Sequence, residues 1–96
     1  MIVSFADPAT QALYRGEQTG KAGSIPQDIR KVARRKLDYL AAAIHLSELR
    51  IPPGNRLEAL KGSARGKWSI RINDQWRIIF SWTDAGPAEV SIVDYH

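Results

Sequence analysis

The sequence contains no cysteine among its 96 residues, which excludes a disulfide framework and any zinc site built from thiolates. Its two histidines, His45 and His96, lie far apart and match neither H-x-x-x-H nor H-E-x-x-H, so no metal site is expected. P-loop, G-x-G-x-x-G and G-x-S-x-G motifs are absent too. Nucleotide binding and hydrolase-type acyl transfer therefore have no support, and no cofactor is expected.

The sequence also lacks any apolar run close to the ~20 residues that span a membrane. Residues 1–5 are largely apolar, but Asp7 follows, and neither a basic region nor an apolar region of signal-peptide length is present. We therefore expect a cytoplasmic protein that does not associate with membranes.

The composition is that of an ordinary folded chain, with 44% hydrophobic and 25% charged residues. Its length fits one domain over residues 1–96 with a single core. The 14 Lys and Arg residues outnumber the 10 Asp and Glu residues, which gives a net charge of +4. This balance favours an acidic partner, whether nucleic acid, an anionic surface or an acidic protein.

The first half of the chain has helical patterns. Residues 1–5 predict a short strand, and Asp7-Pro8 is typical of a helix N-cap followed by proline, so a helix should run to about Arg15. A polar, glycine-containing stretch over residues 16–23 predicts a loop.

A capping box beginning at Ser24 predicts a long helix. Its apolar residues recur at three- and four-residue steps, so that one stripe should pack on a core: Ile25, Ile29, Val32, Ala33, Leu37, Leu40, Ala41 and Ile44. Residues 46–49 can add a helical turn, and Pro52-Pro53-Gly54 should end it. His45 is expected to be a partly buried structural residue.

The second half alternates apolar and polar residues, which predicts strands over residues 56–61, 67–73, 75–83 and 88–95. The expected fold class is therefore α+β, with a small antiparallel sheet packed against two or three N-terminal helices. The three tryptophans share an alternating face with isoleucines and should belong to the core: Trp68, Trp76 and Trp82.

The pairing register of the central hairpin follows from its apolar face. A three-residue loop pairs Ile70 with Ile78, whereas a two-residue loop would mix the faces. This register sets Arg71 opposite Arg77 on the other face, where like charges repel. Either a bound anion relieves them, or both side chains splay into solvent.

The surroundings of this arginine pair favour an anion. Lys61, Arg65 and Lys67 precede it and make a phosphate-binding surface. Continuing the register pairs Phe80 with Val90 and Ile78 with Ile92, and brings Tyr95 to the arginine face. The directions of Asp94 and His96 at the chain end stay open.

Three segments together resemble the HigB toxins of the RelE/ParE superfamily. They are Pro53-Gly54-Asn55-Arg56-Leu57 through Leu60-Lys61-Gly62, then Trp68-Ser69-Ile70-Arg71-Ile72-Asn73-Asp74-Gln75-Trp76-Arg77-Ile78-Ile79-Phe80, and finally Val93-Asp94-Tyr95-His96. The resemblance covers most of the second half of the chain and implies a compact antiparallel sheet flanked by N-terminal helices.

The same resemblance implies a function and partners. HigB-type toxins cut mRNA in the ribosomal A site, so the resemblance implies a ribosome-dependent endoribonuclease. The chemistry that this needs, attack by an RNA 2′-hydroxyl on the adjacent phosphate, requires no metal. The expected antagonist is a HigA-type antitoxin with a helix-turn-helix DNA-binding region, and operator DNA would be contacted only through this antitoxin.

Carried onto this chain, the family's catalytic set places Lys61 and Arg77 at the phosphate and Asp94, Tyr95 and His96 at the terminus. Glu58 lies where some relatives have a histidine, so either Glu58 acts as the base or activity is reduced. Further RNA contacts are expected from four basic residues: Arg56, Arg65, Lys67 and Arg71.

The expected roles follow from the side-chain chemistry. Histidine titrates near neutrality, and the terminal carboxylate and Asp94 would favour the protonated form of His96, so His96 should act as the acid. Tyr95 would orient or stack a base, and Asp94 would orient His96 or Tyr95.

Two other functions remain open. The superfamily includes ParE-type toxins that inhibit DNA gyrase without cutting RNA. This alternative stays open because the chain has Glu58 where some relatives have a second histidine. A plain RNA-binding module would bind RNA in a salt-sensitive way without toxicity.

Overall fold

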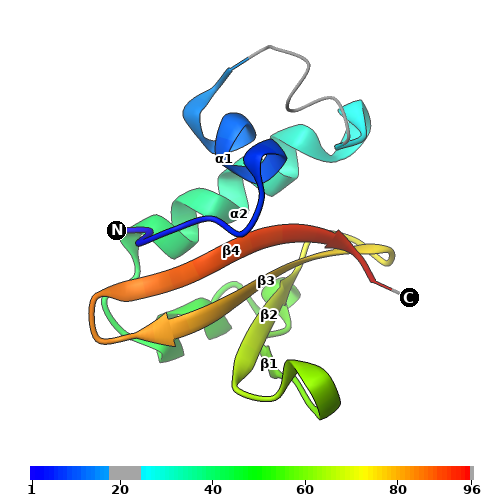
Figure 1. The fold of residues 1–96 in the computed structure, drawn as a ribbon. Helices are drawn as coiled ribbons and strands as arrows, with labels where there is room; N and C mark the ends of the chain where they lie inside the picture. Colours follow the sequence, from blue (N-terminus) through cyan, green and yellow to red (C-terminus); the bar gives the residue numbers. More distant parts are fainter. Residues whose placement is uncertain (18–24, 96) are drawn as a thin grey trace.

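A computed structural model describes residues 1–17 and 25–95. Within these ranges two α-helices precede a four-stranded antiparallel sheet of order β1-β2-β3-β4 (Figure 1). The elements are α1 Pro8–Arg15, α2 Arg30–Ala42, β1 Glu58–Ala59, β2 Lys67–Arg71, β3 Trp76–Thr83 and β4 Gly86–Asp94, with 3-10 turns at Gln27–Ile29, Leu46–Arg50, Pro53–Asn55 and Gly62–Ala64. The predicted α+β class is confirmed.

Helix α1 begins and ends as predicted. The Asp7 carboxylate accepts a hydrogen bond from the backbone N–H of Thr10 at 2.7 Å and from its hydroxyl at 3.0 Å, and Pro8 fills the first turn. Gly16 ends the helix in the left-handed conformation (φ 76°). The Thr10 hydroxyl oxygen also accepts a hydrogen bond from the Ile92 N–H at 3.0 Å, which joins α1 to β4 inside the protein.

Helix α2 is shorter than predicted. A 3-10 turn over Gln27–Ile29 precedes it, Ile29 provides no side-chain cap, and the expected capping residue Ser24 lies outside the described residues. The helix ends at Ala42, so Ile44 falls beyond it and is 78% exposed, which makes its place in the apolar stripe wrong. His45 is exposed as well, contrary to the expectation of partial burial.

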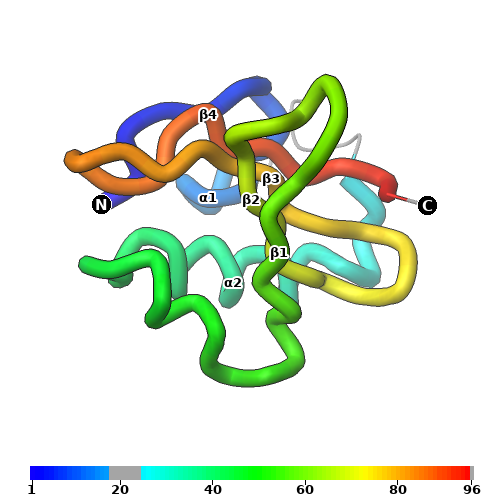
Figure 2. The backbone as a smooth tube through the Cα atoms, turned by 90° about the horizontal axis from the view of Figure 1, so that it is seen from below, coloured from blue at the N-terminus to red at the C-terminus, as the bar shows by residue number. Residues whose placement is uncertain are grey.

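The core lies between α2 and one face of the sheet. Its most deeply buried members come from both sides of this interface: Ala33, Leu37, Leu40, Ile70, Ile78, Phe80 and Val90. Helix α1 contacts both α2 and β4, and Figure 2 shows α2 along one side of the sheet. The three tryptophans are partly buried against this core, as expected.

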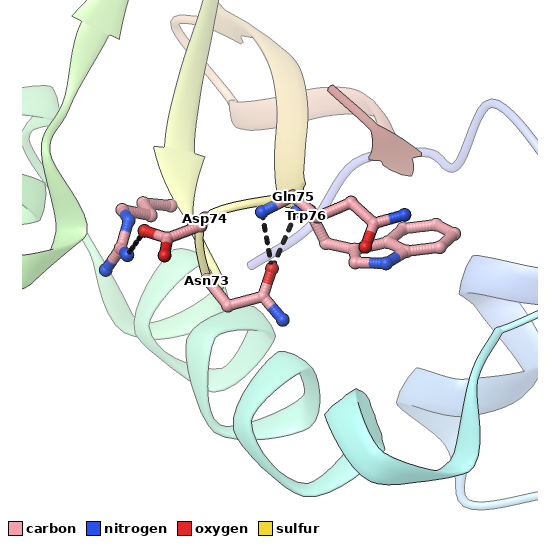
Figure 3. Close-up of polar contacts among 5 residues, drawn as sticks. Asn73, Asp74, Gln75 and Trp76 are labelled. Carbon is pink, nitrogen blue, oxygen red and sulfur yellow. Dashed lines mark hydrogen bonds and ion pairs between the residues drawn. The ribbon is translucent and has the colours of Figure 1, made fainter. Parts of the chain in front are cut away.

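The predicted hairpin register is confirmed. Ile70 pairs with Ile78 and Arg71 with Arg77, and the Ile72 N–H donates to the Trp76 carbonyl at 2.9 Å. Figure 3 shows how the turn is held: the Asn73 side-chain oxygen accepts from the backbone N–H groups of Gln75 and Trp76, both at 2.8 Å.

The pairing of β3 with β4 departs from the prediction. Ile78 pairs with Ile92 as expected, but the register shifts between Ile79 and Ser81, so the pairing of Phe80 with Val90 fails. The extra residue lies in β4, where Glu89 has a φ of 52°. The alternation of apolar and polar residues along the chain did not indicate this bulge.

Two predicted strands are reduced. Residues 1–5 form only a parallel bridge, Phe5 with Val90, although Val3 N–H also bonds to the Pro87 carbonyl at 2.7 Å. The strand expected over residues 56–61 shrinks to Glu58–Ala59, because Arg56 adopts a left-handed conformation (φ 45°) that breaks the extended chain.

Candidate functional site

Arg77 is the centre of the candidate site, on the sheet face opposite the core. It is only 7% exposed. Its Nη1 donates to the Ser69 hydroxyl at 2.8 Å, and its Nη2 donates to the Arg56 carbonyl at 3.2 Å. The Glu58 carboxylate lies 3.3 Å from Nη1 and 3.5 Å from Nη2. Strands β1, β2 and β3 therefore combine to hold one buried guanidinium.

Tyr95 covers this guanidinium. The Arg77 Cζ lies 5.7 Å from the centre of the Tyr95 ring, within range of a cation–π interaction. Tyr95 itself is 45% exposed, so its ring contacts both the arginine and solvent. The hairpin register had predicted that Tyr95 falls on this face, and the structure places it there.

The hairpin turn fixes the segment that carries Tyr95. The backbone N–H of Tyr95 donates to the Gln75 carbonyl at 2.6 Å, and the Gln75 side chain donates to the Asp94 carboxylate at 3.0 Å. Asp94 is thus turned toward Gln75. His96, the proposed acid, lies outside the described residues.

The repulsion between Arg71 and Arg77 is relieved in a way that was not predicted. Arg71 pairs with the Asp74 carboxylate in the turn, and Arg77 pairs with Glu58 (Figure 3 draws the Asp74 pair). Each arginine therefore has its own carboxylate, and neither a bound anion nor splaying into solvent is needed to explain the register.

The remaining predicted contact residues come from β2 and from the segments that flank β1. Lys67, at the other end of β2 from Arg71, pairs with Glu89 at 3.5 Å. Lys61 and Arg65 are exposed on the two sides of the Gly62–Ala64 turn. Arg56 contributes its carbonyl oxygen, not its guanidinium, to Arg77, and its side chain is exposed.

A buried polar pair beneath the site was missed. Lys36 is 6% exposed and donates to the Asn55 side-chain oxygen at 2.6 Å, while the Asn55 amide donates to the Leu49 carbonyl at 3.1 Å. Burial lowers the pKa of Lys36, and the positive charges of Arg35 and Arg71 lower it further. This pair ties α2 to the residue just before Arg56.

Sequence signals for these supporting residues existed in part. Lys36 interrupts the apolar stripe of α2, between Ala33 and Leu37, and such a position indicates burial. Gln75 and Ser69 had no local signal, because their partners come from other strands.

Residues 1–17 and 25–95 contain no group of three His, Asp or Glu side chains that could hold a metal ion. In these same ranges no helix is long and apolar enough to cross a membrane. The candidate site thus consists of a buried guanidinium held by three strands and a half-exposed aromatic ring beside it.

Known proteins resemble the chain over nearly its whole length. Residues 3–96 match a family described as the RelE-like toxin of the type II toxin-antitoxin system HigB. The Vibrio cholerae serotype O1 protein named Toxin HigB-1 is 42% identical over 96 residues, which cover 100% of this chain and 98% of that protein.

Two more relatives extend the comparison. The Proteus vulgaris protein named Endoribonuclease HigB is 31% identical over 101 residues, with 100% of both chains covered. An uncharacterized Haemophilus influenzae protein is 42% identical over 71 residues, which cover 73% of this chain and 70% of that protein.

Proposed function

The chain belongs to the HigB-like toxin family of type II toxin–antitoxin systems, as its sequence resemblance indicated, and we propose that it is a ribosome-dependent endonuclease that cleaves mRNA without a metal. The name of the Proteus vulgaris relative supports the nuclease activity. The observation that carries the proposal is the Arg77 guanidinium, fixed on the open sheet face beneath the Tyr95 ring.

The proposed reaction is attack by an RNA 2′-oxygen on the adjacent phosphorus. The new O2′–P bond forms as the P–O5′ bond breaks, the 2′-hydroxyl gives its proton to Glu58 or to solvent water, and the leaving 5′-oxygen gains one from His96. Negative charge grows on the phosphate in the transition state, so a cation already in position stabilises it without reorganisation. Arg77 is such a cation because two neutral groups fix its direction.

The other roles are assigned by chemistry and place. Tyr95 stacks or orients a base, since its ring is open to solvent beside Arg77. His96 protonates the leaving oxygen, and Asp94 orients the terminal segment. Lys61 approaches the phosphate from the loop after β1, and the outer RNA contacts come from four basic residues: Arg56, Arg65, Lys67 and Arg71.

Glu58 has two possible roles in this scheme. It accepts the proton of the 2′-hydroxyl, or it takes no part in proton transfer and activity is lower than in relatives with a histidine there. The carboxylate lies 3.3 Å from Nη1 of Arg77, the residue proposed to hold the phosphate.

Family membership implies an antitoxin partner. We propose that this antitoxin is a HigA-type protein with a helix-turn-helix region and that the toxin contacts operator DNA only through it. The toxin itself acts in the cytoplasm, on mRNA in the A site of the small ribosomal subunit.

Primer extension on mRNA with and without ribosomes tests the nuclease proposal. Wild-type protein should produce cuts only with ribosomes, and Arg77→Ala and His96→Ala should abolish them. The exposed α2 lysine gives a control, Lys31→Ala, that should cut normally. Absence of cuts with wild type, together with gyrase-linked DNA damage that persists in the variants, would replace the nuclease with a ParE-type inhibitor.

A further inference from the structure

Arg77 has two kinds of partner. Two neutral oxygen atoms, the Ser69 hydroxyl at 2.8 Å and the Arg56 carbonyl at 3.2 Å, fix the guanidinium plane, and the Tyr95 ring covers it. The Glu58 carboxylate alone brings a negative charge within ion-pair distance of it among the described residues. The neutral contacts orient the cation, and the carboxylate balances its charge.

The carboxylate is the loosest of these partners. Its oxygens lie 3.3 and 3.5 Å from Nη1 and Nη2, longer than the 2.7–2.9 Å of a close charge-assisted bond. The Glu58 side chain is 56% exposed, whereas the Arg77 side chain is 8% exposed. Glu58 also belongs to a two-residue edge strand. It can therefore turn into solvent while Arg77 stays in place.

The Glu58 carboxylate occupies the edge of the Arg77 guanidinium that a phosphodiester would use. A phosphodiester pairs with arginine through two oxygens facing two guanidinium nitrogens, which is the arrangement that Glu58 adopts at Nη1 and Nη2. Both anions cannot occupy those nitrogens together. Like charges held this close would also repel each other.

We propose that Glu58 is an internal competitor of the RNA phosphate at Arg77, and that RNA binding displaces its carboxylate into solvent. This inference rests on the proposed function and assigns Glu58 to control of substrate affinity. A carboxylate that has left the site cannot take the 2′-hydroxyl proton, so Glu58 is not the base.

The proposed competition links the stability of the fold to the affinity for an RNA phosphodiester. In the free protein Glu58 neutralises a buried cation, and its removal leaves that charge uncompensated, which destabilises the fold. A bound phosphodiester restores the balance. Glu58→Gln should therefore be less stable than wild type without ligand and should gain more stability when ligand is added.

The test compares binding of a 2′-O-methyl RNA trinucleotide, which carries phosphodiesters but cannot be cleaved through the 2′-oxygen. Titration calorimetry at constant ionic strength should give Glu58→Gln about fivefold tighter binding than wild type, the scale of one partly exposed charge pair. The control Asp38→Asn removes the same charge from the exposed face of α2 and should bind nearly as wild type does.

Several results would overturn the proposal. Equal affinities of Glu58→Gln and Asp38→Asn would do so, as would no measurable binding by any of the three proteins. Ribosome-dependent cleavage lost in Glu58→Gln with unchanged trinucleotide affinity would identify Glu58 as the base instead.

Two further controls keep the result readable. If Glu58→Gln fails to fold by circular dichroism, Glu58→Asp retracts the carboxylate from Arg77 while keeping the charge, and should also bind more tightly than wild type. If wild-type protein cuts no mRNA on ribosomes, the nuclease proposal fails, and the binding comparison still decides whether Glu58 competes at Arg77.

Discussion

At the scale of single residues, the site consists of charges that already have partners. Arg77 and Arg71 face each other across the β2–β3 pair, and each is neutralised by a nearby carboxylate, Glu58 and Asp74. A sheet can tolerate directly opposed arginines in this way without a ligand. In the competition that we propose at Arg77, an incoming phosphate replaces an existing ion pair, which lowers the affinity for the substrate.

Gln75 is expected to position the terminal segment without touching RNA. Gln75→Ala removes the hydrogen bond to Asp94 but keeps the backbone bond to Tyr95. We expect the cleavage rate on ribosomes to fall by about tenfold, the scale of one charge-assisted hydrogen bond, with the trinucleotide affinity unchanged. Single-turnover cleavage and calorimetry measure the two effects, and an equal loss of affinity would contradict a purely positioning role.

Lys36 should give stability a distinct pH dependence. Burial and two nearby arginines lower its pKa in the folded state below the unfolded value of 10.5. The unfolded chain therefore binds more protons between those two pKa values, so the unfolding free energy should rise with pH across that window. Urea unfolding of wild type and Lys36→Met between pH 7 and roughly 10 checks this. Parallel pH profiles of the unfolding free energy in the two proteins would refute this prediction.

At the scale of elements, buried polar contacts join the N-terminal helices to the second half of the chain. Thr10 is buried, its hydroxyl donates to Asp7, and the same oxygen accepts from the Ile92 N–H. The contact closes the helix cap and fixes β4 against α1. The Lys36–Asn55 pair likewise connects α2 to the turn before β1.

Thr10→Val should expose the importance of that contact. The substitution keeps the shape but leaves the buried Ile92 N–H without an acceptor, which should cost about 1–3 kcal/mol of unfolding free energy. Thr10→Ser keeps the hydroxyl and should retain most of the stability. Chemical denaturation of the three proteins measures the difference, and equal losses in both variants would assign the effect to packing.

How much could be predicted differs between elements. The β2–β3 register followed from the sequence because only one face is apolar, so a slip of one residue would turn Arg71 or Arg77 toward the core face. The bulge at Glu89 could not be predicted, since a glutamate with positive φ has no sequence signature. The Glu58–Arg77 and Gln75–Asp94 contacts were not predicted either, because the first depends on the pairing of β1, β2 and β3 and the second on the pairing of β3 with β4.

At the scale of the whole molecule, the N-terminal segment holds the far end of the sheet. The Met1 amino group donates to the Ala41 carbonyl at 2.6 Å, and Val3 bonds to Pro87 in β4. Gly86, at the β3–β4 turn, has a φ of 124°, and a Cβ there would lie 2.5 Å from the Met1 carbonyl oxygen. Helix α2, the N-terminus and the turn thus meet at one place.

Gly86→Ala should therefore lower stability by about 1–3 kcal/mol, because the backbone conformation is strained for alanine and the methyl group displaces Met1. Gly54→Ala is the matched control: no atom lies within 4 Å of the added Cβ, so stability should change little. Thermal unfolding compares the two variants. Similar melting temperatures would show that the N-terminal segment moves away from the added methyl group without loss of stability.

The N-terminal segment also affects how separate copies of the protein associate in solution. The unpaired backbone groups of an exposed sheet edge pair with strands of neighbouring molecules, and this pairing leads to aggregation. Here residues 3–6 bond to Pro87, Glu89 and Val90 and cover that part of the outer edge of β4, and the opposite edge, β1, is only two residues long. Because one edge is partly covered and the other is short, we expect little aggregation through edge-to-edge strand pairing.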